Sequence, residues 1–202
     1  LEEIKDEVNH IFLHSGKEGL PYHNLDHTMH VVSRAGEIAR HYNLDDRDFF
    51  IVVAAAWFHD IGYYTGEPNG HEERGAAMAG DFLQARNVDA AVVQQVKACI
   101  LATHMPQHPK NLLEEIVCDA DLYHFGTDLF PELNKKMRKE VEMRTGQKIG
   151  KQQWRSSAVQ LLEAHHYHTE YARNLLNNAK AAHLQRIKEK DMPSKKQEQV
   201  KE

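Results

Sequence analysis

Apolar residues recur at helical spacing along nearly the whole chain. Val31, Ala35 and Ile38 fall on one face of a helix, and an apolar residue returns at every fourth position from Leu129 to Val141. Strand-like alternation over a useful length is absent. The pattern predicts an all-α fold with about nine helices, at residues 1–14, 25–42, 45–59, 71–86, 89–104, 111–125, 128–145, 151–166 and 168–190.

The length of 202 residues suits one domain with a substantial core, and no internal repeat is visible. We expect a single domain over residues 1–185, followed by a polar, charged tail or linker over 186–202. No apolar run approaches the 18 residues of a membrane span, and no signal peptide opens the chain. The two cysteines, Cys99 and Cys118, fit a reducing compartment, so we expect a cytoplasmic protein.

Charge and histidine content narrow the function classes. The chain carries 25 basic and 30 acidic residues, a net charge of −5, which disfavours a protein whose main ligand is a nucleic-acid polymer. Its 15 histidines outnumber its 14 Phe and Tyr residues together. This excess raises the question of which imidazoles take part in chemistry.

A His-Asp doublet ends the run IVVAAAWFHD, whose apolar residues predict a buried helix. His59 and Asp60 therefore need a polar partner, because an unpaired buried charge is costly. A divalent metal ion would satisfy both side chains, since imidazole nitrogen and carboxylate oxygen are good ligands for such ions. The alternative is a histidine at a helix C-terminus that is hydrogen-bonded to a neighbour.

Two further segments place polar residues beside apolar faces. In YHNLDH, His23 and His27 are four residues apart and share a face if the segment is helical. A single inward histidine is more often a satisfied core residue than a ligand. In LLEEIVCDADL, Asp119 and Asp121 follow an apolar stretch, where two carboxylates are costly unless they meet a cation. Helix capping explains them poorly, because the predicted helix continues through both.

Five segments occur in order along the chain: YHNLDH, AAWFHDIGY, HEERGA, ILATH and DADLYHFG. Over residues 21–180 the chain resembles the HD-domain superfamily of metal-dependent phosphohydrolases, named for the His-Asp doublet. The similarity is greatest to small bacterial proteins described as predicted metal-dependent HD phosphohydrolases. The resemblance implies a single-domain helical bundle of the HD-domain type.

The resemblance also implies roles for individual residues. His27, His59, Asp60 and Asp121 match the four metal ligands of the family, which implies a divalent ion: Mn, Fe, Ni, Co, Mg or Zn. Asp60 has a catalytic role in this scheme, orienting the attacking water or bridging to a second ion. His23 matches a histidine that protonates the leaving oxygen in the related cyclic-nucleotide phosphodiesterases.

Four other residues are candidates for a second ion or for orienting the ligands: His71, Glu72, His104 and Asp119. The alternative for His71 is a polar helix start beside a flexible loop. Arg138 is a candidate for binding phosphate, because relatives tend to carry an arginine followed by a glutamate in this region. The alternative for its neighbours in KKMRKEVEMR is a solvated helix face.

The expected function is metal-dependent hydrolysis of a phosphate ester, with a nucleotide as the substrate, by a phosphomonoesterase or phosphodiesterase. The expected partner is a small phosphorylated molecule, and a homodimer is left open. The alternative is a nucleotide-binding sensor domain, coupled to a partner or to a membrane segment outside this sequence. Turnover of nucleotides in the presence of added metal distinguishes the two.

Overall fold

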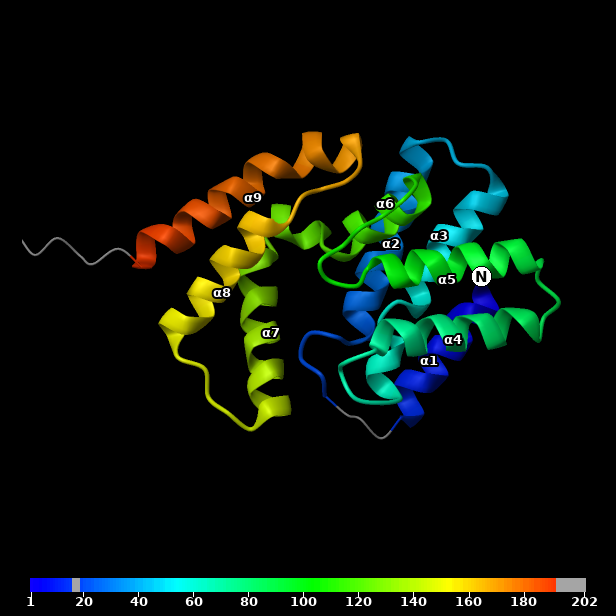
Figure 1. Ribbon diagram of the computed structural model, residues 1–202, viewed down its shortest axis with the longest axis horizontal. Helices are drawn as coiled ribbons and strands as arrows, with labels where there is room; N and C mark the ends of the chain where they lie inside the picture. Colours follow the sequence, from blue (N-terminus) through cyan, green and yellow to red (C-terminus); the bar gives the residue numbers. More distant parts are fainter. Residues whose placement is uncertain (16–18, 192–202) are drawn as a thin grey trace, which may run out of the picture.

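The computed structural model describes residues 1–15 and 19–191 (Figure 1). Within these ranges the chain forms nine α-helices and two short 3₁₀ helices, with no strand, which confirms the predicted all-α class. The elements are α1 Glu2–His14, α2 Leu25–His41, α3 Asp46–Phe58, η1 Ile61–Tyr64, α4 His71–Gln84, α5 Ala90–Ala102, α6 Leu112–Asp121, η2 Tyr123–Gly126, α7 Phe130–Thr145, α8 Lys151–Ala164 and α9 Glu170–Asp191.

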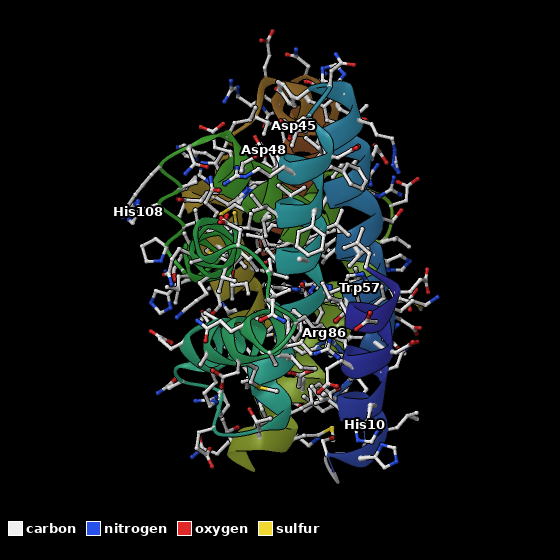
Figure 2. The ribbon with its side chains drawn as sticks, turned by 90° about the vertical axis from the view of Figure 1, so that its right-hand side faces the viewer. His10, Asp45, Asp48, Trp57, Arg86 and His108 are labelled. Atoms are coloured by element: carbon white, nitrogen blue, oxygen red, sulfur yellow. The ribbon has the colours of Figure 1, made fainter. Side chains whose placement is uncertain are left out.

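Side-chain caps determine where several helices begin. The Asn24 side chain accepts a hydrogen bond from the His27 backbone N–H, which starts α2 and places His27 in its first turn. The Asp45 side chain accepts in the same way from the Asp48 N–H, and Figure 2 shows both residues at the start of α3. The asparagine of the YHNLDH segment is therefore explained by local helix geometry.

Helix α3 lies at the centre of the core. Every residue from Ile51 to Phe58 is buried, and the helix packs against α1, α2, α4, α5 and α6. A helix that is apolar on all sides is stable only when neighbours surround it. His59 and Asp60 follow its last turn, so the doublet lies inside the protein.

Helices α7, α8 and α9 form a second group, which Figure 1 shows beside the group made by α1 to α6. Helix α8 packs on α9, and both α7 and α9 pack on η2, the short helix that links the two groups. The end of α6 therefore lies where the two groups of helices meet.

Two glycines allow close backbone approaches around the doublet. A Cβ atom on Gly62 would lie 2.0 Å from the carbonyl oxygen of His71, and one on Gly75 would lie 2.7 Å from the carbonyl oxygen of Phe58. Larger residues would force η1 and α4 away from the end of α3. These glycines therefore hold the first turn of α4 against the doublet.

One helix boundary differs clearly from the expected one. The helix predicted over 111–125 is divided, because α6 ends at Asp121 and η2 follows. The division into a domain over residues 1–185 and a tail over 186–202 stays a prediction, and α9 continues to Asp191. The remainder of the expected tail, residues 192–202, lies outside the described residues. Among the described helices, none is both long enough and apolar enough for a membrane span.

Candidate metal centre and adjoining cavity

The structure brings together the four residues expected to bind metal. His27 comes from the first turn of α2, His59 and Asp60 follow α3, and Asp121 is the last residue of α6. The His27 Nε2 atom lies 3.3 Å from Asp60 Oδ2 and 3.3 Å from Asp121 Oδ1. The corresponding distances from His59 Nε2 are 3.0 Å and 3.6 Å.

Three atoms of this cluster suit a cation. His27 Nε2, His59 Nε2 and Asp60 Oδ2 are buried and have no hydrogen-bond partner among the described residues. Ligand atoms of these three side chains lie within 4.8 Å of one another. The His59 Nδ1–H donates to the Ala56 carbonyl oxygen at 2.9 Å, so the lone pair of its Nε2 is directed at the cluster. Buried polar atoms without partners are costly, and a bound ion would satisfy all three.

The electrostatics of the cluster favour added positive charge. Burial alone would lower the pKa of His59, but Asp60 and Asp121 outweigh it, so the pKa of His59 is raised well above its ordinary value. The pKa of His27 is raised for the same reasons. Burial would raise the pKa of Asp60, and the neighbouring histidines instead hold it well below its usual range. The site therefore stabilises ionised carboxylates that attract a cation.

Glu140 is a site residue that the sequence did not single out. It is completely buried and accepts hydrogen bonds from the backbone N–H groups of Tyr22 and His23, at 2.8 and 2.9 Å. It also accepts from the Nδ1–H of His23 at 2.5 Å. The His23 ring is thereby fixed at the cavity that also contains Asp60.

The signal for Glu140 is present in the sequence but is easily missed. Leu133 and Met137 line the cavity from α7, and Glu140 and Arg144 continue their spacing along the same face. The Arg144 guanidinium lies 3.5 Å from Glu140 Oε1 and is placed over the Tyr63 ring. Although most of the α7 sequence is polar, these four residues form one face that points into the protein and ends in the Glu140–Arg144 ion pair.

His71, Glu72 and His104 lie beside the metal cluster. His71 Nε2 is 3.6 Å from Asp60 Oδ1, whereas His27 and His59 lie on the other carboxylate oxygen, Oδ2. The Glu72 carboxylate lies 3.1 Å from His71 Nδ1 and 3.1 Å from His104 Nδ1. The structure therefore places three of the four candidates for a second ion, or for orienting the ligands, next to Asp60 and to one another. His108, by contrast, points away from the helices on the loop after α5 (Figure 2).

The structure does not bring Asp119 or Arg138 to this cluster. Asp119 accepts hydrogen bonds from the His168 N–H at 2.8 Å, and from the N–H and Oγ1–H of Thr169 at 2.7 Å each. It lies two residues before Asp121, about 200° around the helix, and so faces the opposite way. Arg138 bonds to Glu142 and to the Ile149 carbonyl oxygen.

Asp119 therefore anchors the loop between α8 and α9. We expect Asp119→Ala to lower the free energy of unfolding by about 3 kcal/mol, because buried donors of this loop lose their acceptor. The metal content should stay equal to that of the wild type. Chemical denaturation and elemental analysis, with the exposed Asp128→Ala as control, measure both. Loss of metal at unchanged stability would contradict this role.

A separate histidine, His165, is 5 % exposed and packs edge-on against Phe125 and Tyr167. Burial and then the nearby Lys180 ammonium lower the pKa of His165 to about 3. Lys180 Nζ donates to His165 Nδ1 at 3.3 Å. The imidazole is therefore neutral in the folded protein at neutral pH.

Because His165 is neutral in the folded protein, we expect the free energy of unfolding to decrease in acid. Because the pKa of His165 is lower in the folded state, the unfolded state takes up its proton first as the pH falls below about 6.5. We expect a loss of roughly 2 kcal/mol of stability between pH 7.5 and pH 5 from this residue. Between pH 7.5 and pH 5, the melting temperature of His165→Gln should therefore fall by about 5 °C less than that of the wild type. The exposed His166→Gln should leave the slope unchanged; equal slopes in all three proteins would refute the assignment.

A cavity of about 270 Å³ adjoins the metal cluster and has two unlike ends. His23, Asp60, His71, Glu72 and Asp121 line the polar end. The other end is lined mostly by large apolar side chains from α7 and α8: Phe130, Leu133, Met137, Trp154 and Leu161. The arrangement suits a ligand with a charged group at one end and an apolar ring or chain at the other.

Comparison with known proteins assigns the family. The family model described as "HD domain" matches residues 24–126, about half of the chain. The chain belongs to the HD-domain family. HD domains are generally metal-dependent hydrolases, and the group of His27, His59 and Asp60 is where this HD domain could hold an ion.

Two solved structures share the fold of this HD domain. A predicted HD superfamily hydrolase from an uncultured Thermotogales bacterium has a TM-score of 0.62 and 23 % identity, covering 94 % of this chain and 90 % of its own. Bacillus subtilis YpgQ, in complex with ADP, has a TM-score of 0.62 and 19 % identity, covering 93 % of this chain and 98 % of its own. No curated protein matches the chain.

Proposed function

We propose that this HD domain hydrolyses a phosphate ester of a nucleotide with the help of a divalent metal ion. The observation that carries the proposal is the set of three buried ligand atoms without partners, beside a cavity with one polar end. The structure of YpgQ, which has a similar fold, holds ADP, and this supports a nucleotide as the ligand class.

His27, His59, Asp60 and Asp121 would hold the ion. When bound, such an ion lowers the pKa of a coordinated water towards neutral and withdraws charge from a phosphoryl oxygen. Residues of this chain hold these side chains in position. The Ala56 carbonyl oxygen orients the His59 ring. Asp60 directs Oδ2 towards His59 and Oδ1 towards His71.

His23 would give a proton to the leaving oxygen. With Nδ1–H bonded to Glu140, the opposite nitrogen, Nε2, is the one left for the substrate, and in the doubly protonated ring it carries the proton that would go to the leaving oxygen. Glu140 also holds the backbone of Tyr22 and His23, so both the ring and its backbone are fixed in place. A fixed donor contributes to the rate because it needs no reorganisation during the reaction.

The apolar end of the cavity would accommodate the organic part of the substrate. Met137 and Trp154 offer a flexible and aromatic surface that suits the flat face of a nucleobase. The charged end of the same cavity lies at Asp60 and Asp121, so a phosphate near the ion and a base near Trp154 would occupy one continuous space.

The test is a screen of nucleoside mono-, di- and cyclic phosphates with Mg, Mn, Ni and Co, together with elemental analysis of the purified protein. We expect bound metal and turnover of at least one nucleotide. Tight nucleotide binding without turnover would favour the sensor alternative instead. Absence of both metal and nucleotide binding would refute the proposal. The homodimer and the cytoplasmic location stay predictions.

A further inference from the structure

We propose that the groove between α7, α8 and α9 binds a small polyphosphate anion at a site separate from the metal centre. The groove has a volume of about 530 Å³. Seven of the chain's 25 Lys and Arg residues line it, three from α7, two from α8 and two from α9. Such a concentration of positive charge is unexpected in a chain with a net charge of −5.

The carboxylate that lines the groove, that of Glu142, is already engaged by donors of this chain. Glu142 accepts from Arg138 Nε at 3.1 Å, from Lys148 Nζ at 3.2 Å and from the Ile149 N–H at 3.0 Å. It therefore neutralises Arg138, and it is the one carboxylate among the described residues that line the groove. The side chains of Lys139, Lys151 and Arg186 are exposed and make no hydrogen bond or ion pair with any described residue.

The surroundings favour a small anion over a long polymer. Since seven positive charges line the groove, the rest of the chain is more negative than the net charge of −5 indicates, and it would repel a polyanion that extends beyond the groove. The groove is bounded by three helices and is comparable in volume to a small-molecule site. Phe130, Trp154 and Ile187 provide an apolar part of the lining, which suits an organic group attached to the phosphates.

The groove shares a wall with the cavity that adjoins the metal cluster. Phe130, Asn134 and Trp154 line both spaces, and Trp154 Nε1–H donates to Asn134 Oδ1 at 3.0 Å. Trp154 is therefore a natural reporter for a ligand in the groove. Arg138, the residue expected from the sequence to bind phosphate, lies in this groove and not at the metal centre.

The test is a calorimetric titration of the full chain with inorganic tripolyphosphate in the presence of EDTA. We expect saturable binding that weakens at least tenfold in Lys139→Glu/Lys151→Glu. The control Lys5→Glu/Lys110→Glu makes the same change of net charge at exposed positions outside the groove and should bind within twofold of the wild type. Asp60→Ala should also bind normally, which separates this site from the metal centre.

Two further measurements complete the test. In a Trp57→Phe background, where Trp154 is the remaining tryptophan of the chain, tripolyphosphate should change the tryptophan fluorescence with the same affinity. Circular dichroism confirms that each variant is folded. No binding, equal weakening in both double variants, or loss of binding in Asp60→Ala would overturn the proposal. Binding of a dT₂₀ oligonucleotide more than tenfold tighter than tripolyphosphate would overturn it in favour of a polymer site.

Discussion

Replacing Asp60 with alanine is expected to remove the bound metal ion and phosphate-ester hydrolysis together. Asp60 Oδ2 lies 3.0 Å from His59 Nε2 and 3.3 Å from His27 Nε2, so its loss deprives the cluster of its central carboxylate. Changes in groups that merely support a ligand cost about 10- to 100-fold in metal affinity or activity. Loss of a ligand itself should lower metal affinity and activity by more than about 100-fold. Elemental analysis measures the bound metal, and initial rates measure the activity.

Matched variants separate this effect from a general loss of structure. Asp60→Asn retains the volume of the side chain but removes its charge, and it should also lose metal. Asp81→Ala removes an exposed carboxylate from α4 and should leave metal content and rate unchanged. If folded Asp60→Ala retained its metal and its hydrolysis rate, the assignment of the metal centre would be wrong.

The second large effect is expected at the pair formed by His23 and Glu140. Both His23→Ala and Glu140→Gln should lower kcat by about 100-fold for nucleotide esters, because general acid catalysis contributes about 10²- to 10⁴-fold. Esters of 4-nitrophenol need little protonation of the leaving oxygen, so their rates should fall far less. Steady-state kinetics with both substrate types provide this comparison.

The double variant tests whether the two residues act as a unit. Because Glu140 acts through the His23 ring, the combined loss should be close to that of His23→Ala alone and not the product of the two single losses. Glu132→Gln, an exposed glutamate on the same helix, is the control and should have the wild-type rate. Equal losses for nucleotide and 4-nitrophenyl esters would show that the pair has only a structural role.

Local physics explains why most of the fold could be predicted. Helix positions follow from apolar spacing and from caps such as Asn24 and Asp45, both of which act within a few residues of the chain. The predicted helix starts and ends therefore agree with the structure to within a few residues, except where α6 gives way to η2 after Asp121.

The sequence by itself determined the all-α class and, through its motif resemblance, the four candidate ligands that the structure brings together. Only the tertiary structure decided the role of Glu140, which meets His23 across 117 residues of sequence. It also decided that Asp119 holds a loop and that Arg138 lies in a separate basic groove. The reason is physical: helical spacing shows which residues share a face, but a polar face can meet either water or a buried partner, and only packing between distant helices determines which.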